Sequence, residues 1–132
     1  MRVMLDTNII ISIVIFNSEK LKQLLTRICD NYSLVLSSYI IKEVEDVTKR
    51  KFPNKVEDIE KFLYKLPYEM EYVPSKIDIK TIPNIRDCKD MPILYSAIVL
   101  DVDILITGDK DFEDVEIERP EIMTAIEFLE KY

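Results

Sequence analysis

Short apolar runs and longer stretches with helical spacing take turns along this chain. Val3-Met4-Leu5, Leu34-Val35-Leu36 and Ile104-Leu105-Ile106 contain no polar residue, as is typical of strands that are buried on both faces of a sheet. Residues 70–73 predict a further strand, and residues 121–123 predict a weak one. The pattern therefore predicts a sheet of four to five strands.

The segments between these strands have apolar residues at the spacing of a helix. In the clearest case, Leu21, Leu24, Leu25, Ile28 and Cys29 fall at positions i, i+3, i+4, i+7 and i+8. The helices are expected at 8–16, around 21–29, from Ser37 or Ser38 to about 51, at 54–66, at 91–100 behind Asp90 as N-cap, and after Thr124, which can form a capping box with Glu127.

Strands that alternate with helices predict an α/β fold, here a three-layer sandwich with a mostly parallel central sheet of four to five strands flanked by helices. The crossover connections should be right-handed. The length of 132 residues is typical of one domain, so residues 1–132 are expected to form a single domain. The stretch 72–86, which contains two prolines, is interpreted as a connection inside that domain.

Composition excludes several kinds of site. The chain has no His, which removes His-based triads, His general bases and His-ligated zinc. Cys29 and Cys88 are too few for a four-thiolate metal site or a disulfide framework, and they favour a reducing cytoplasm. With a net charge of −7, the protein cannot coat nucleic acid by charge alone. Any nucleic-acid role must therefore depend on a local site.

No targeting or membrane segment is expected. The longest apolar stretch, residues 9–16, has eight residues, whereas a membrane helix needs about 20. A signal peptide would have a basic start, but Asp6 precedes this stretch. The sequence therefore predicts a cytoplasmic protein with no membrane partner.

Four acidic residues are expected to meet where the parallel strands end. Asp6 ends the first strand, and Glu43 lies in the second turn of the helix that follows the second strand. Asp90 begins the helix that leads to the strand at 104–106, and Asp109 follows that strand, with Asp111 two residues further on. Sites in open parallel sheets form at this edge. Each acid could also be a helix cap, a turn residue or a solvated flank, but their joint placement favours a site.

Gly108 is the only glycine of the chain, where average usage predicts about nine. It lies between Thr107 and Asp109. Glycine permits a positive φ angle or a close approach of the backbone to a ligand. A tight turn after the strand is the alternative.

Clustered carboxylates repel one another and need a counter-charge. Without His, and with thiols that do not group, the candidate ligands are hard oxygens, which favour Mg²⁺ or Mn²⁺. Thr7, Asn8, Ser12 and Thr107 are candidates to orient the carboxylates and their waters. Carboxylate-held Mg²⁺ typically serves phosphate chemistry.

The order and spacing of these residues resemble PIN domains, most closely the prokaryotic toxin group of the VapC type. The resemblance covers nearly the whole chain, and the segments that carry it are Met4-Leu5-Asp6-Thr7-Asn8, 37–44, 90–97, 107–112 and 122–129. It implies a Mg²⁺- or Mn²⁺-dependent endoribonuclease that cleaves RNA, is held by a cognate antitoxin and forms a homodimer.

The resemblance also assigns roles to the acids. It makes Asp6, Glu43, Asp90 and Asp109 the catalytic residues that bind the metal, and it makes Asp111 accessory. The residues Thr7, Asn8, Ser12, Thr107 and Gly108 would support them.

Two other functions stay open. A receiver-like signalling module has a similar length and acids at strand ends, but it needs two adjacent acids after its first strand, where this chain has Asp6 alone. A degenerate PIN fold that only binds a partner is the second alternative. It stays open because many relatives have another acid directly after the third one, where this chain has Met91, although Asp87 is nearby.

Overall fold

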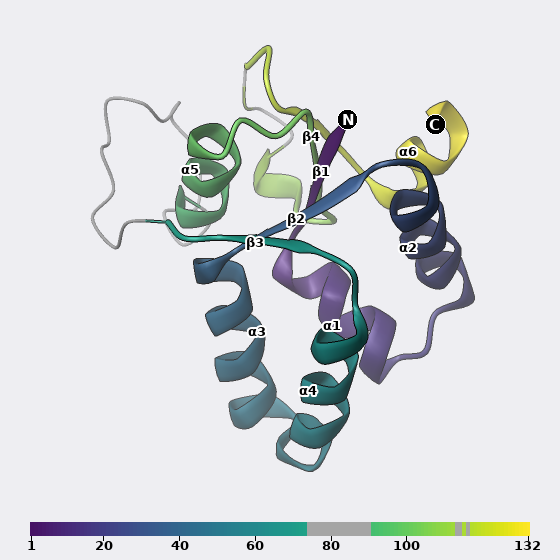
Figure 1. Cartoon of the computed structure of the whole chain (residues 1–132), viewed down its shortest axis with the longest axis vertical. Helices are drawn as coiled ribbons and strands as arrows, with labels where there is room; N and C mark the ends of the chain where they lie inside the picture. The colour runs from purple at the N-terminus through teal and green to yellow at the C-terminus, as the bar shows by residue number, and fades with distance from the viewer. Residues whose placement is uncertain (74–90, 113–114, 116) are drawn as a thin grey trace.

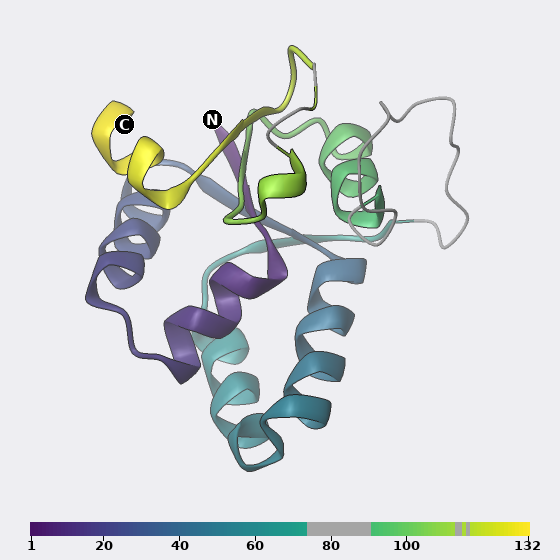
Figure 2. The ribbon, with the colours of Figure 1, turned by 180° about the vertical axis from the view of Figure 1, so that it is seen from behind.

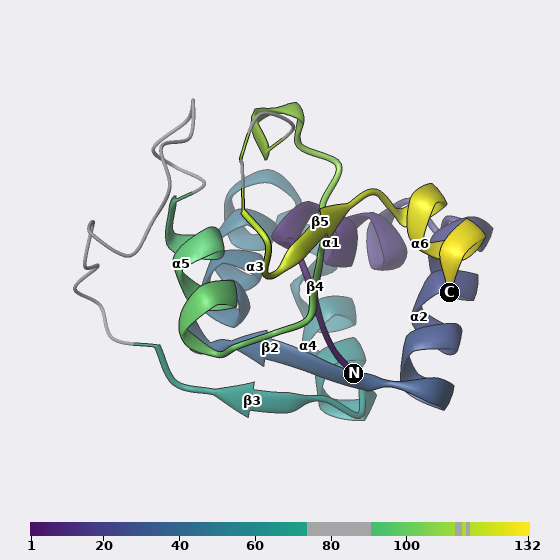
Figure 3. The ribbon, with the colours of Figure 1, turned by 90° about the horizontal axis from the view of Figure 1, so that it is seen from above.

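The computed structural model describes residues 1–73, 91–112, 115 and 117–132. Five strands form one sheet, in which every pair of neighbours is parallel. The strands are β1 (Arg2–Leu5), β2 (Ser33–Ser37), β3 (Glu69–Glu71), β4 (Ile104–Ile106) and β5 (Glu121–Met123), and their order across the sheet is β3-β2-β1-β4-β5. Figure 3 shows β3 and β5 at opposite sides of this sheet.

Helices cover both faces of the sheet, which confirms the α/β sandwich. Figures 1 and 2 show α1, α3 and α4 below the sheet and α5 above it. The helices of the described residues are α1 (Thr7–Ile15), α2 (Glu19–Asn31), α3 (Ser38–Lys51), α4 (Val56–Lys65), α5 (Met91–Val99) and α6 (Ala125–Lys131), with short 3₁₀ turns η1 (Pro53–Lys55) and η3 (Lys110–Phe112). None of these helices is long and apolar enough to cross a membrane.

The strand order creates a switch point in the middle of the sheet. From β1, the strands β2 and β3 follow on one side of the sheet, and β4 and β5 follow on the other side of β1. Right-handed crossovers in opposite directions leave a crevice between the carboxyl ends of the two strands where the direction reverses, here β1 and β4. A receiver-like module would have the order β2-β1-β3-β4-β5, so the strand order contradicts that alternative.

The apolar pattern predicted the core correctly. The three central strands are buried along their apolar runs, and the face of α1 that contacts α3 and α4 is also buried. At the other end of the molecule, Phe128 of α6 is fully buried against the rings of Tyr32 and Tyr132.

Several boundaries differ from the expectations. The first helix begins at Thr7 rather than at residue 8, because Asp6 accepts a hydrogen bond from Thr7 as its N-cap. Asn54 does not open the fourth helix: it lies in η1, and α4 starts at Val56 without a side-chain cap. Pro53 fixes the backbone for the tighter turn there. The third strand ends at residue 71, and most of the expected connection 72–86 lies outside the described residues.

Candidate active site

Asp6 lies at the switch point, directly after β1, with only 4 % of its surface exposed. Its Oδ1 accepts a hydrogen bond of 2.6 Å from the backbone N–H of Thr7. Its Oδ2 accepts one of 2.7 Å from the hydroxyl of Thr107. Both oxygens are therefore held by donors, and the carboxylate has one fixed orientation.

The sheet register explains this contact between residues a hundred positions apart. Leu5 of β1 pairs with Ile106 of β4, so Asp6 and Thr107 follow on neighbouring strands. The backbone N–H of Asp6 also donates to the carbonyl of Ile106 at 3.0 Å. The apolar runs that define the strands thus place the acid and the hydroxyl together.

The pKa of Asp6 is raised above its ordinary value. Burial is the largest cause, since it disfavours the charged carboxylate. The hydrogen bonds from Thr107 and Thr7 oppose this increase, whereas the negative charges of Glu43 and Asp109 add to it. The influence of both acids on Asp6 indicates that three of the predicted site residues share one neighbourhood.

Glu43 lies half-buried in the second turn of α3. Its Oε2 accepts a hydrogen bond of 2.6 Å from the hydroxyl of Tyr39, one turn earlier on the same helix. Sequence reasoning missed Tyr39. The signal was present, because residues at i and i+4 of a helix lie on the same face.

Thr107 connects Asp6 to the segment after β4. Its hydroxyl oxygen accepts a hydrogen bond of 3.1 Å from the backbone N–H of Asp109. Because the oxygen accepts there, its single hydrogen is available for Asp6. Thr107 therefore orients Asp6 and the backbone of Asp109 through one buried hydroxyl.

Gly108 is exposed, and the special conformation expected of it is absent. Its φ angle is not positive, and a Cβ atom added to it would meet no atom within 4 Å. A positive φ angle is therefore not the reason for glycine at this position, whereas a close approach of the backbone to a ligand stays a prediction. The turn that follows β4 is held by the Thr107 hydroxyl instead.

The three polar candidates on α1 have different surroundings. The hydroxyl oxygen of Thr7 is buried and has no hydrogen-bond partner among the described residues. Asn8 is exposed in the first turn, and Ser12 is half-buried further along the helix. No described contact links the Ser12 side chain to Asp6. Thr7 is thus the candidate with an unused donor and acceptor beside the acid.

The described acids do not by themselves form a metal site. Among residues 1–73, 91–112, 115 and 117–132, no three carboxylate or thiol side chains come close enough to hold one ion. Asp90, the fourth predicted acid, and Asp87 lie outside the described residues, and Asp111 is described by its backbone in η3 alone.

The carboxylate oxygens of the described acids fit a hard cation. Each oxygen of Asp6 accepts one hydrogen bond and has capacity for another contact. No ion pair of the described residues includes Asp6 or Glu43. Oxygen ligands with uncompensated negative charge are the chemistry that Mg²⁺ and Mn²⁺ require.

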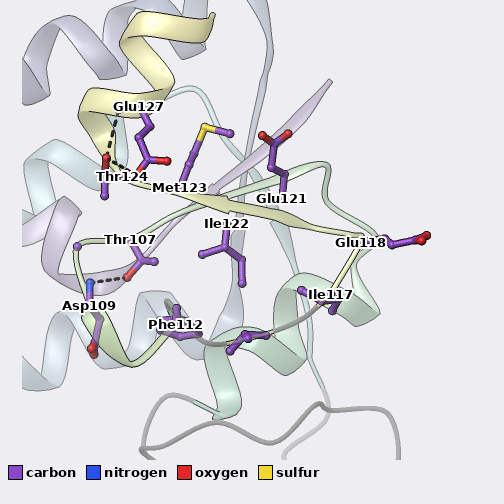
Figure 4. Close-up of a pocket in the computed structure, with 12 residues that line it drawn as sticks. Thr107, Asp109, Phe112, Ile117, Glu118, Glu121, Ile122, Met123, Thr124 and Glu127 are labelled. Atoms are coloured by element: carbon purple, nitrogen blue, oxygen red, sulfur yellow. Dashed lines mark hydrogen bonds between the residues drawn. The ribbon is translucent and has the colours of Figure 1, made fainter.

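A cavity of about 390 Å³ begins at Asp109 and follows β5 to the first turn of α6 (Figure 4). The acidic side chains of its described lining are Asp109, Glu118, Glu121 and Glu127, and no Lys or Arg is among the described lining residues. Glu121 pairs with Lys131 at 2.6 Å, but the excess of carboxylates in the described lining still disfavours a polyanion there.

Comparisons with known proteins agree with this fold. The family model described as PIN domain matches residues 2–111. The crystal structure of VapBC2 from Rickettsia felis, bound to a DNA fragment from their promoter, contains a chain of similar fold with a TM-score of 0.69. The two chains are 21% identical, and the similarity covers 93% of this chain and 97% of that one. No curated protein sequence matches.

Proposed function

The chain belongs to the PIN domain family, and from that membership we propose that it is a divalent-metal-dependent endoribonuclease. It hydrolyses phosphodiester bonds of RNA and acts as the toxin of a toxin–antitoxin pair. Residues 1–132 work as one nuclease domain. Its proposed catalytic residues are Asp6, Glu43, Asp90 and Asp109.

The observation that carries the proposal is the electrostatic state of Asp6. Its carboxylate is buried, is held by two donors and is close enough to Glu43 and Asp109 for their charges to raise its pKa. Like charges that lie close together cost free energy in a folded protein. Such an arrangement is expected where a cation binds and offsets the repulsion.

In this proposal Asp6, Glu43 and Asp109 hold Mg²⁺ or Mn²⁺ together with Asp90, and Asp111 is accessory. The bound ion would supply a water of lowered pKa and positive charge opposite the phosphate. Thr107 and the Thr7 backbone keep Asp6 in one orientation. The buried Thr7 hydroxyl, with Asn8 and Ser12 further along α1, is available to polar ligands of the site.

The negative net charge is compatible with an RNA substrate. Four of the seven excess negative charges belong to the proposed site, which leaves −3 outside it. Lys42 is exposed directly beside Glu43, and Lys49, Arg50 and Lys51 are exposed at the end of α3. Phosphates can contact these cations, so RNA is expected to approach along α3 rather than through the acidic cavity beside β5.

Cleavage of single-stranded RNA in Mg²⁺, in Mn²⁺ and in EDTA tests the proposal. We expect cleavage with either ion and none in EDTA, and a near-complete loss in Asp6→Asn. Asp46→Asn is the matched control: it makes the same chemical change at an exposed residue of α3 that is not part of the proposed site. Cleavage that persists in EDTA or in Asp6→Asn would contradict the proposal. A folded protein that binds RNA or a partner without cleaving would favour the degenerate PIN alternative.

The proposed partners need separate tests. Resemblance to the VapC group supports an antitoxin partner and a homodimer. The chain of similar fold in the VapBC2 structure belongs to a complex, which supports the antitoxin partner alone. Light scattering of the purified protein is expected to give twice the chain mass of 15.6 kDa. A monomer at micromolar concentration would contradict the homodimer and leave the nuclease proposal standing.

A further inference from the structure

Tyr39 is a hydrogen-bond partner of Glu43, one of the proposed metal-binding acids, and it is not among the polar residues that the sequence indicated. Its hydroxyl donates to Oε2 of Glu43 at 2.6 Å, and both side chains are half-buried. We infer that Tyr39 is a positioning residue: it fixes the Glu43 carboxylate in the orientation in which that carboxylate binds the cation. This inference rests on the proposed function.

The contact is suited to positioning because of its chemistry. A hydroxyl that donates to a charged carboxylate forms a short, strong hydrogen bond. The bond occupies Oε2 of Glu43 and leaves Oε1 as the oxygen without that bond. A glutamate side chain has several rotatable bonds. Fixing one of its carboxylate oxygens therefore reduces the conformational entropy that the side chain loses when it binds a metal ion.

The N-cap and the buried face of α3 are formed by residues other than Tyr39. Ser37 caps the helix by accepting from the backbone N–H of Ile40 at 3.1 Å. Ile40, Val44 and Thr48 form the buried face of the helix. A phenylalanine at position 39 would keep the ring while removing the hydroxyl that donates to Glu43.

Mn²⁺ affinity, measured by calorimetry on the full chain, tests the inference without relying on activity. Partners that orient a metal ligand typically change metal affinity by about 10–100-fold. We expect Tyr39→Phe to weaken Mn²⁺ binding by about tenfold and to leave the melting temperature in EDTA unchanged. Tyr64→Phe is the matched control, because Tyr64 on α4 is 91% exposed, and its Mn²⁺ affinity should equal that of the wild type.

A double-mutant cycle covers the case in which Tyr39→Phe is itself unstable. Glu43→Asp keeps the charge but shortens the side chain, which withdraws the carboxylate from Tyr39. In that background Tyr39→Phe should cause no further loss of Mn²⁺ affinity, because the hydrogen bond is already gone. Independent, additive losses would overturn the positioning role.

The outcomes separate this inference from the proposed function. If the wild type binds Mn²⁺ and Tyr39→Phe binds it equally well, the positioning role is wrong and the metal site stands. If the wild type binds no Mn²⁺, both are wrong. RNA cleavage by Tyr39→Phe should recover at saturating Mn²⁺, whereas a defect that persists there would assign Tyr39 a different, structural role.

Discussion

Replacing Thr107 by Val removes one buried hydroxyl from the centre of the proposed site and little else. Val has nearly the same shape, and Thr107 is only 3% exposed. Two hydrogen bonds are lost: the bond of 2.7 Å to Oδ2 of Asp6 and the bond of 3.1 Å from the Asp109 backbone. The bond to Asp6 matters more, because its acceptor is a buried carboxylate.

The cost follows from these two bonds. A hydrogen bond to a charged group contributes about 1.5–3 kcal/mol, and a neutral one about 1 kcal/mol. Asp109 is half-exposed, so its backbone N–H can donate to water instead, and the loss of its bond to Thr107 costs little free energy. We expect Thr107→Val to lower the free energy of unfolding by about 2–3 kcal/mol near neutral pH.

This cost should depend on pH. Burial holds the pKa of Asp6 above its ordinary value, and the Thr107 hydrogen bond opposes that increase. The folded protein therefore takes up a proton on Asp6 before the unfolded chain does, so this group stabilises the fold as pH falls and destabilises it as pH rises through its folded pKa. Without Thr107 the pKa rises further and the destabilisation at neutral pH is larger. The difference between variant and wild type should shrink as the pH falls through the folded pKa of Asp6, because the carboxyl is then increasingly protonated.

Urea unfolding in EDTA at neutral pH and at one acidic pH measures this difference. Thr48→Val is the matched control: Thr48 is equally buried, but its hydroxyl donates to the backbone carbonyl of Val44 at 2.7 Å. Its cost should be about 1 kcal/mol and independent of pH. Thr107→Ser, which keeps the hydroxyl, should retain most of the pH dependence of the wild type. A Thr107→Val cost that equals the Thr48→Val cost at both pH values would refute the reasoning.

Three further substitutions test other parts of the molecule. Glu43→Gln removes one of the charges that raise the Asp6 pKa, so it should raise the free energy of unfolding in EDTA by up to about 1 kcal/mol. It should also abolish the stabilisation by Mn²⁺ in thermal melts, and an unchanged Mn²⁺ response would contradict the role of Glu43 as a ligand. Gly108→Ala should leave stability unchanged or raise it by about 0.4–1 kcal/mol, because the φ angle and the space are compatible with a Cβ; a loss above about 1 kcal/mol by urea unfolding would show that the description of this turn is wrong. Phe128→Ala should lower the free energy of unfolding by about 3–5 kcal/mol, because the ring is fully buried, and a cost below about 1 kcal/mol would contradict its place in the core.

The sequence carried enough information to predict the sheet and the edge at which Asp6 and Thr107 lie. Runs such as Val3-Met4-Leu5 are buried on both faces, and parallel strands have their carboxyl ends at one edge. The contact between Asp6 and Thr107 also requires that β1 and β4 are neighbours, and the apolar pattern does not give this strand order. The alternatives for Asp6, a helix cap or a site residue, were not exclusive: it caps α1 through Oδ1 and receives the Thr107 hydroxyl on Oδ2.

Other features depend on side-chain geometry that an apolar pattern does not encode. The scarcity of glycine suggested a special backbone at Gly108, but a hydroxyl shapes that turn. Tyr39 was missed because tyrosine on a helix flank usually serves packing; its i, i+4 spacing allowed a contact with Glu43, and the structure shows that contact as a hydrogen bond. The roles of Asp90 and Asp111 stay predictions, since Asp90 and the side chain of Asp111 lie outside the described part of the chain.

The donors that hold Asp6 and Glu43 share one property that bears on the counter-charge of the site. They are a backbone N–H, the hydroxyl of Thr107 and the hydroxyl of Tyr39, all of which are neutral. A lysine or arginine in their place would orient the acids equally well, but it would also neutralise them and compete with a metal ion. Neutral donors fix the carboxylates and leave their negative charge in place. Within the described residues, relief of the repulsion between Asp6 and Glu43 is then left to a cation from solution, which is the physical reason to expect that a divalent ion stabilises this chain.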